Sequence, residues 1–442
     1  MLSPWTHVKW IAFRALETAA AGLTRFRSGG HEAAAATGRR RFPENNGGRL
    51  WLFASTIGEL NAIEPFLARY LPAAGNPDLL LVCDHAHYRE AFLARYPAAT
   101  FLYLTADSAD TRRAVDAWPP VALMIAEMPC LLSDAPGRFP FAVVYHVKRR
   151  GTPVFLVNGW LYRSAPASRI DAVEKTLFDH DYLRLIDVML VQNDEIKAEL
   201  VAHGADPKRV ETTGNIKFDG IDRRSWSPDQ AKDPAMLRNI EAAARPCIVA
   251  GCVTNLPDQE AILDAFRTTL AAVPDALLVL APRHPEVLER MQKLESFLRE
   301  RALACAFKSR LGGAGLAPAT QVLVLDTMGE LKDFYAVATL TYVGPNHNVL
   351  EPLAFDKPVF VLPGWEPGYP SFPVYRMMLG RSAIIEVAGP AELAAAWMEF
   401  FREPGRVQSQ KARIRSALAR EAGATERALA ALSARGFVPR TD

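Results

Sequence analysis

The chain has 442 residues, more than one ordinary hydrophobic core organises, so we expect two domains of about 200 residues each. Lys and Arg total 51 against 49 Asp and Glu, a formal net charge of +2 that argues against a nucleic-acid-binding protein. Five cysteines are scattered without CxxC spacing, which favours reduced, cytoplasmic thiols over a disulfide framework or a zinc site. We find no signal peptide and no apolar run long enough to span a bilayer.

Residues 1–48 are predicted to form an amphipathic helix followed by a loose linker. Apolar side chains recur at near-helical spacing with basic ones between them: Trp5, Val8, Ile11, Leu16, Leu23 and Phe26, beside Trp10 and Phe13, with Lys9, Arg14, Arg25 and Arg27. Such a helix either lies in a membrane interface or packs its apolar side on the protein, and both interpretations stay open here. Residues 28–48 are polar and Gly-rich, which is typical of a linker.

Short apolar runs alternate with helix-like segments after this linker. We expect strands at 49–55, 78–83, 100–104, 121–126, 153–158 and 187–192, and the same rhythm restarts at 246–252, 276–283, 321–327, 340–345, 357–363 and 382–387. Because these runs are continuously apolar, the strands are predicted to be buried on both faces of parallel sheets covered by helices.

The predicted architecture is α/β, with two doubly wound Rossmann-like domains that face a cleft. The first spans 49–220 and the second 237–400, joined by a polar, Pro-bearing linker at 221–236. The helical segment 401–442 could cross back over the first domain. Ligands of such sheets bind at the carboxyl ends of the strands, so polar residues that end a strand are the candidates for chemistry.

Glu59 is the first of these candidates. It follows a predicted strand and lies in the first turn of a predicted helix, within the stretch LWLFASTIGELNAIEPFL. An acidic residue is favoured there by the helix dipole alone, by ~0.3–1 kcal/mol. The same position is where open α/β sheets place their chemistry, and position cannot separate the two interpretations.

In the second half, three strand ends carry groups suited to an anion. Arg283 and His284 leave a strand before Pro285 opens a helix; they could clamp a phosphate or carboxylate, or Arg283 could pair with an interdomain acid. Met328, Gly329 and Glu330 could offer free helix N–H groups to a nucleotide, unless the residues before them simply cap that helix.

Asn348 and Glu351 have the spacing of a capping box, although Glu351 could equally accept from ribose hydroxyls. The chain carries no P-loop, no dinucleotide fingerprint and no nucleophile elbow. His85 and His87 lack a third clustered ligand, so no metal centre is predicted.

Five short motifs occur in register over roughly residues 49–400. They are Gly58-Glu59, GNIKFD (214–219), PRHPE (282–286), DTMGEL (326–331) and HNVLEP (347–352). In these motifs the chain resembles the Kdo transferases. These are GT-B-fold enzymes of glycosyltransferase family 30 that move 3-deoxy-D-manno-oct-2-ulosonic acid (Kdo) from its CMP derivative to a lipid A precursor.

The resemblance implies an inverting, metal-independent transfer with no cofactor besides the nucleotide-sugar donor, which it implies is CMP-Kdo. It also implies a lipid A precursor or another glycolipid as acceptor, and a peripheral location at the cytoplasmic face of the inner membrane, or in the cytoplasm.

The same resemblance assigns roles to the candidate residues. It makes Glu59 the general base, with Ser55, Gly58 and Glu127 on the acceptor side. The donor-side residues it implies are Lys217, Arg283 and His284 at the anionic groups, Met328, Gly329 and Glu330 at the nucleotide, and Asn348 and Glu351 at its phosphate and ribose. A general base must be ionised before the acceptor arrives, and we expect the helix N-terminus to keep Glu59 charged.

Departures from the family pattern leave two other functions open. Residues 252–260 lack the histidine of the family's Ser-Thr-His-x-Gly-Glu-Glu run, the Gly-rich loop is shortened to 344–346, and the family's Glu-x-Glu-x-Trp-Pro is altered at 127–130. One alternative is a GT-B transferase with a different sugar donor or acceptor, such as a capsule or O-chain glycan. The other is a catalytically silent paralogue that acts as a binding module.

Overall fold

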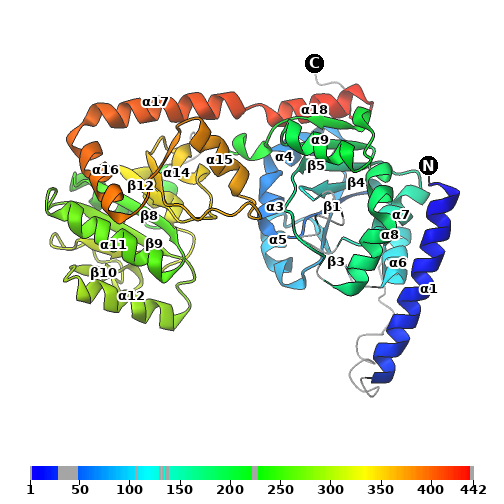
Figure 1. Cartoon of the computed structure of the whole chain (residues 1–442), viewed down its shortest axis with the longest axis horizontal. Coiled ribbons are helices and arrows are strands. Elements are labelled where there is room, and N and C mark those ends of the chain that lie inside the picture. The colour runs from blue at the N-terminus through cyan, green and yellow to red at the C-terminus, as the bar shows by residue number, and fades with distance from the viewer. Residues whose placement is uncertain are drawn as a thin grey trace. The chain divides into compact units, whose positions relative to one another are not determined.

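A computed structural model describes residues 2–27, 48–104, 107–128, 131, 134, 139–166, 168–221 and 227–438. The contacts divide the chain into two compact units (Figure 1). Unit 1 comprises Met1–Gly220 and Glu421–Asp442, and unit 2 comprises Ile221–Arg420. Nearly all of the predicted linker at 28–48 lies outside the described residues.

Unit 1 is built on a parallel sheet of seven strands in the order β3-β2-β1-β4-β5-β6-β7. Its strands are β1 (Arg49–Phe53), β2 (Asp78–Cys83), β3 (Thr100–Tyr103), β4 (Pro120–Ala126), β5 (Val154–Gly159), β6 (Val188–Val191) and β7 (Val210–Thr212). Alternate residues of one strand enter two separate hydrophobic clusters: Trp51 and Phe53 one, Leu50 and Leu52 the other. Burial of both faces therefore explains the continuously apolar strand sequences.

Helices cover both faces of this sheet (Figure 1). The cluster around Trp51 is closed by α1 (Pro4–Arg27), α6 (Ser108–Ala117), α7 (Phe141–Arg149), α8 (Arg169–Leu185) and α9 (Asp194–Ala202). The opposite cluster is closed by α3 (Ile57–Ala62), α4 (Glu64–Ala73), α5 (Arg89–Arg95) and α18 (Ala424–Ala434). Short 3₁₀ helices occur at η1 (Ala86–Tyr88), η2 (Pro207–Arg209) and η3 (Ile216–Phe218).

The end of the chain belongs to unit 1, because α18 packs against α4 and η3. The Asp219 carboxylate accepts from the backbone N–H groups of Gly423 (2.6 Å) and Thr425 (2.5 Å). Arg427 Nε donates to the carbonyl of Thr213 (2.8 Å). These contacts tie the last helix to the GNIKFD segment, so part of that motif has a structural role.

We expect Asp219→Ala to loosen α18, because two N–H groups at the start of this helix lose their acceptor. The expected cost is about 1–2 kcal/mol of local stability, the usual range for removing an N-terminal cap. Hydrogen exchange of residues 424–434 should accelerate accordingly. Asp206→Ala, which removes the cap of the exposed η2 turn, should leave this exchange unchanged; equal protection in both variants would contradict the assigned role.

Unit 2 is also built on a parallel sheet of seven strands, in the order β10-β11-β9-β8-β12-β13-β14. Its strands are β8 (Cys247–Val253), β9 (Leu277–Pro282), β10 (Cys305–Phe307), β11 (Val322–Val324), β12 (Leu340–Val343), β13 (Val359–Val361) and β14 (Ile384–Glu386).

The helices of unit 2 are η4 (Pro228–Gln230), α10 (Pro234–Ala242), α11 (Leu256–Leu270), α12 (Leu288–Glu300), η5 (Lys308–Arg310), α13 (Leu331–Val337), α14 (Leu350–Ala354), α15 (Phe372–Gly380), α16 (Pro390–Arg402) and α17 (Pro404–Glu421). Side chains of α11, α12 and α16 enclose one face of the sheet in a single cluster. The described part of segment 221–236 already contributes η4 and the start of α10.

The predicted α/β fold with two doubly wound parallel sheets is confirmed. Two strands, β7 and β10, were not predicted from the sequence. Each is three residues long and lies at the edge of its sheet. Within the described residues, no helix has both the length and the apolar character that crossing a bilayer would require.

Candidate active site

Five of the eleven non-glycine residues with positive φ in the described chain lie at the predicted edges of the two sheets. In unit 1, Glu127 (φ 57°) follows β4 and Asn158 (φ 59°) lies at the end of β5. In unit 2, Cys252 (φ 56°), His284 (φ 59°) and Asn346 (φ 66°) lie at the ends of β8, β9 and β12. A left-handed backbone at a non-glycine residue costs about 1 kcal/mol or more, so it persists only where surrounding contacts hold it. The contacts at these strand ends therefore fix the backbone in this conformation.

Glu127 is the centre of a buried polar network in unit 1, with 1% of its surface exposed. Its carboxylate accepts from Asn158 Nδ2 (2.9 Å) and the Tyr162 hydroxyl (2.6 Å). It also forms an ion pair with Lys217 Nζ (2.9 Å). Buried charges survive only when they are paired and hydrogen-bonded, and Glu127 meets both conditions.

The strand ends themselves place Lys217 beside Glu127. Asn158 Oδ1 accepts from the backbone of Ile216 (2.9 Å), and Asn215 Oδ1 accepts from the backbone of Lys217 (3.0 Å). Asn215 Nδ2 in turn donates to Gln192 Oε1 (3.0 Å). Side chains from the ends of β5, β6 and β7 therefore fix the turn that carries Lys217. The sequence placed this lysine with the donor-side residues, whereas its ion-pair partner is the acceptor-side candidate Glu127.

Glu59 lies in the first turn of α3, as predicted, and Thr56 is the N-cap whose hydroxyl accepts from the Glu59 backbone (3.2 Å). The Glu59 carboxylate turns back toward the preceding strand and accepts from the Ser55 N–H (2.7 Å). Only 5% of the residue is exposed. Gly58 lies between Thr56 and Glu59 in a conformation open to any residue.

The prediction that the helix N-terminus keeps Glu59 ionised is wrong for the free protein. Burial raises the pKa of Glu59 to about 8, and the negative charges of Glu127 and Asp84 raise it as well. The Ser55 N–H and the Lys217 cation act in the opposite direction but are outweighed. Desolvation of the carboxylate exceeds the stabilisation from the helix terminus, so at pH 7 the side chain is mostly protonated.

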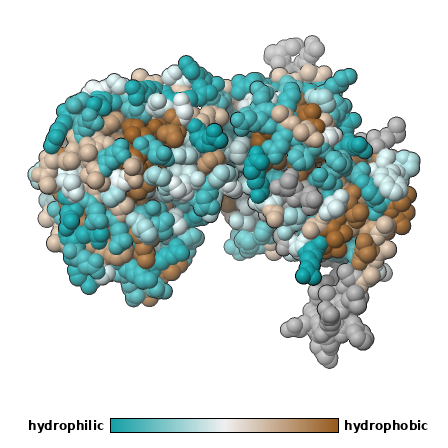
Figure 2. All heavy atoms as spheres, viewed as in Figure 1, coloured by the Kyte–Doolittle hydropathy of each residue, from teal (hydrophilic) through white to brown (hydrophobic). Residues whose placement is uncertain are grey.

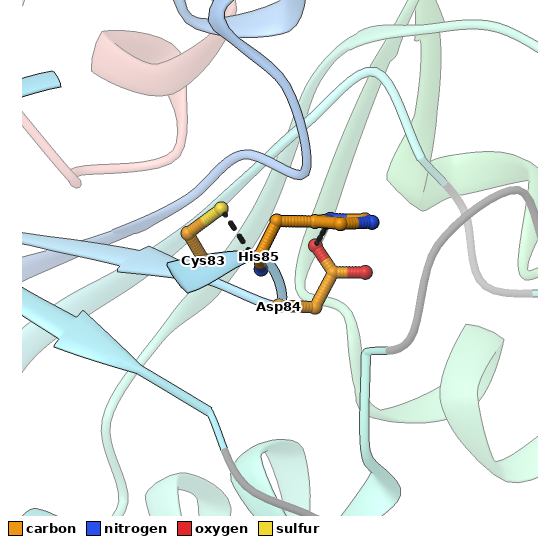
Figure 3. Close-up of side chains that lie close together, drawn as sticks. All are labelled: Cys83, Asp84 and His85. Atoms are coloured by element: carbon orange, nitrogen blue, oxygen red, sulfur yellow. Dashed lines mark hydrogen bonds and ion pairs between the residues drawn. The ribbon is translucent and has the colours of Figure 1, made fainter. Parts of the chain in front are cut away.

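Three consecutive residues at the end of β2 form the one group in the described chain that has metal-ligand character: Cys83, Asp84 and His85 (Figure 3). Asp84 Oδ1 accepts from the Ser55 hydroxyl (2.7 Å) and contacts His85 Nδ1 (2.9 Å). Burial raises the pKa of the Cys83 thiol to about 12, and this thiol donates to the Ser55 carbonyl (3.5 Å). These hydrogen bonds account for the arrangement of the three side chains.

In unit 2, Arg283 is grouped with two residues that the sequence reading did not select. His347 Nε2 lies 2.8 Å from the Thr254 hydroxyl and 3.4 Å from Arg283 Nη1. Burial and the nearby Arg283 hold the pKa of His347 down to about 4, so the ring is neutral at pH 7. Because arginine only donates, Nε2 is the acceptor and keeps the guanidinium at the ends of β8, β9 and β12.

His284 diverges from Arg283, because its Nδ1 contacts the exposed Glu286 (2.9 Å). The prediction that Pro285 opens a helix is wrong: residues 285–286 form a turn and α12 begins at Leu288.

Met328, Gly329 and Glu330 do not begin a helix either, since α13 starts at Leu331. They form a bend in which Gly329 is left-handed (φ 78°) and Met328 is 71% exposed. Lys232 Nζ donates to the Met328 carbonyl (2.7 Å), and Lys308 Nζ lies 3.9 Å from Glu330. Any N–H groups this segment offers to a ligand come from the bend and not from a helix terminus.

Asn348 and Glu351 contact each other, but the predicted capping box is wrong. The N-cap of α14 is Val349, which makes no side-chain cap hydrogen bond. Asn348 Oδ1 accepts from the Leu350 N–H (3.0 Å), and its Nδ2 donates to Glu351 Oε1 (3.4 Å). Burial raises the pKa of Glu351. A capping box therefore does not account for Glu351.

Six residues of these groups were not among the predicted site residues: Asn158, Tyr162, Gln192, Asn215, Thr254 and His347. Gln192 and Thr254 directly follow strands, so the rule of polar strand ends could have found them. Tyr162 comes from a coil segment after β5, where no sequence pattern marks it.

Comparisons with known proteins agree with this arrangement. The profile of the family "3-Deoxy-D-manno-octulosonic-acid transferase (kdotransferase)" matches residues 34–220. A 3-deoxy-D-manno-octulosonic acid transferase of Haemophilus influenzae is 31% identical over 217 residues, 46% of each chain. One from Bordetella pertussis is 31% identical over 261 residues, 56% of each chain. The match thus spans about half the length of these relatives, and over that part the chain is similar to the Kdo transferases.

Solved structures agree on the fold alone. A glycosyltransferase from Rickettsia africae superposes with a TM-score of 0.57 at 9% identity, covering 88% of this chain and 99% of that one. A UDP-GlcNAc 2-epimerase from Neisseria meningitidis superposes with a TM-score of 0.57 at 12% identity, and the match covers 87% of this chain and 99% of that one. The chain has the GT-B fold of two Rossmann-like domains.

Proposed function

We propose that this chain is an inverting, metal-independent glycosyltransferase that moves Kdo from CMP-Kdo to a lipid A precursor or a related envelope glycolipid. The observation that carries the proposal is the buried Glu59 carboxyl at the carboxyl edge of the unit 1 sheet, within electrostatic reach of the Glu127–Lys217 pair. Similarity to the Kdo transferases supports the donor and the acceptor class.

In the proposed reaction Glu59 is the general base. Its carboxylate takes the proton of an acceptor hydroxyl while that oxygen forms a bond to the anomeric carbon of Kdo. The bond from this carbon to the phosphate oxygen breaks, and CMP leaves with the electron pair. A pKa of about 8 makes Glu59 a stronger base than an ordinary carboxylate, at the cost of a small ionised fraction at neutral pH.

Unit 2 is proposed to bind the donor. CMP-Kdo carries a phosphate and a carboxylate, and Arg283 offers a fork of donors suited to either. The neutral His347 orients that guanidinium without adding a charge of its own. Met328, Gly329 and Glu330 are proposed to contact the nucleotide, and Glu351 its ribose. Positive and dipolar groups of this kind stabilise a departing phosphate without a divalent ion.

The acceptor is a glycolipid in this proposal, so the enzyme would work as a peripheral protein at the cytoplasmic face of the inner membrane. The decisive experiment is mass spectrometry of the products after incubation with CMP-Kdo and a lipid A precursor. Added Kdo supports the proposal. Absence of any product, with a thermal-shift preference for UDP or GDP over CMP, would favour a transferase with another donor.

Arg283→Ala is expected to weaken CMP binding by roughly 10- to 100-fold, the value of one or two charge-assisted hydrogen bonds. Isothermal titration calorimetry with CMP measures this directly. Arg290→Ala removes an exposed arginine from the neighbouring helix α12 and should leave the affinity unchanged. An equal loss in both variants would indicate general electrostatic attraction instead of a specific contact.

A further inference from the structure

The outward side of α1 carries no charge. Between Ser3 and Ala19 the exposed residues are Ser3, Pro4, Trp5, Val8, Ile11, Ala12, Ala15, Leu16, Thr18 and Ala19. The large apolar members are exposed to 67% (Trp5), 53% (Val8), 69% (Ile11) and 51% (Leu16). We call these four side chains the outer stripe. A surface helix normally turns charged residues to the solvent, so this face is unusual for a helix in water.

The outer stripe is not a by-product of poor packing, because the opposite side of α1 is well fixed to unit 1. Trp10 stacks on Tyr145 with centroids 4.6 Å apart, and Phe13 meets Phe178 edge-on at 5.7 Å. Thr6 Oγ1 donates to Asp181 (2.7 Å). The helix therefore has two apolar sides, one covered by its own protein and one left open.

The charged side chains of this stretch lie at the flanks and are paired with the protein. Lys9 forms an ion pair with Asp181, and Arg14 with Glu17. Glu17 also accepts from the Ser108 hydroxyl (3.0 Å). No charge would need to be desolvated if the outer stripe entered an apolar phase. Figure 2 shows apolar surface gathered over α1, at the right of the view.

Two observations favour a bilayer over a second copy of the chain as the occupant. The outer stripe exposes roughly 400–500 Å², about half of the ~800 Å² that each partner of a stable dimer buries. The sequence of α1 itself holds four basic residues (Lys9, Arg14, Arg25 and Arg27) against Glu17 alone. That excess favours anionic headgroups, whereas two copies meeting through this region would bring like charges together.

We propose that the outer stripe of α1 docks unit 1 on the surface of an anionic phospholipid bilayer, with the helix lying in the interface. Trp5 suits the headgroup level, where indole rings are enriched, and the aliphatic side chains reach the acyl boundary. The proposal rests on α1 alone and does not depend on which sugar the protein transfers.

Vesicle flotation of the full chain tests the proposal. The probes are vesicles of phosphatidylcholine alone and of phosphatidylcholine with phosphatidylglycerol. The wild type should float with the anionic vesicles, and the Ile11→Glu/Leu16→Glu variant should bind at least ten-fold less. Leu288→Glu is the matched control, because Leu288 is 70% exposed on α12 and lies in the other unit. It should float like the wild type.

Retention of binding by the double variant would overturn the proposal, as would a wild type that floats with neither vesicle or equally with both. A wild type that elutes as a dimer, and a double variant that elutes as a monomer, would show that a second copy covers the stripe. Thermal melting should be unchanged, because both positions point away from unit 1. CMP affinity of the double variant, measured by calorimetry, separates this outcome from any failure of the proposed function.

Discussion

Glu59→Gln is expected to lower kcat for Kdo transfer by about 10²- to 10⁴-fold, the usual contribution of a general base. Glutamine keeps the size of the side chain and its carbonyl can still accept from the Ser55 N–H, so the turn before α3 should persist. CMP binding should be unaffected, because Glu59 belongs to unit 1 and the proposed nucleotide site to unit 2. Initial rates and calorimetry with CMP separate the two effects.

The raised pKa of Glu59 gives activity and stability opposite pH dependences. Only the ionised carboxylate can accept a proton, so kcat/KM should rise with pH and level off above about 8. In the native state the group stays protonated up to about pH 8, whereas the unfolded chain releases that proton near its ordinary value of 4.5. Native stability therefore falls as pH rises from 4.5 to 8, by a few kcal/mol, and is flat above that.

Glu59→Gln should remove this penalty. The variant should melt at a higher temperature than the wild type at pH 8–9 and at the same temperature near pH 4.5. Glu64→Gln is the matched control, since Glu64 lies in the first turn of the next helix but pairs with Arg95 at the surface. An inactive Glu59→Gln with an unchanged pH profile of stability would mean that the carboxyl is not buried as described.

The sequence predicted the two sheets because their inner strands are buried on both faces and must be apolar throughout. The edge strands β7 and β10 carry no such constraint. β7 reads Val-Glu-Thr, with only Val210 buried, and β10 reads Cys-Ala-Phe, with only Phe307 buried. Three residues with one buried side chain do not differ from a loop in sequence, so these strands are defined only by pairing with a neighbour.

For the site, the sequence correctly located the candidate residues at the carboxyl edge of each sheet. It did not predict the electrostatic environment of Glu59. A helix terminus lowers the pKa of a carboxylate modestly, and that part of the environment of Glu59 is visible in sequence. Two other parts of that environment cannot be seen in the sequence: the burial that raises the pKa of Glu59, and the proximity of Glu127. Both arise from tertiary packing, in which β1 and β4 are neighbours. The contact between Thr254 and His347 is equally tertiary, because it joins loops 93 residues apart.

The predictions that helices begin at Pro285 and at Met328 were wrong for a related reason. Proline fixes its own φ but does not require the following residues to be helical, and here a turn intervenes before Leu288. In the other segment the left-handed Gly329 interrupts any helix before Leu331. Sequence spacing gave the order of these elements and missed the short turns between them.

Lys217→Met is expected to destabilise unit 1 by about 2–3 kcal/mol. The substitution leaves Glu127, which is 1% exposed, without its cation, while the apolar stem of the side chain is largely kept. Breaking a buried ion pair typically costs 3–5 kcal/mol, and we expect less because the Lys217 side chain is 21% exposed. Hydrogen exchange of strands β4 and β5 reports this locally, without assuming that both units unfold together.

The same substitution should change catalysis in a direction that a purely structural role would not. The Lys217 cation lowers the pKa of Glu59, so its loss should move the acidic limb of the pH–rate profile to higher pH. The double variant Glu127→Gln/Lys217→Met removes the unpaired charge, so it should recover most of the lost stability. It should also return the acidic limb toward lower pH, because Glu127 raises the pKa of Glu59. Additive losses in the double variant would show that the two side chains do not act as a pair.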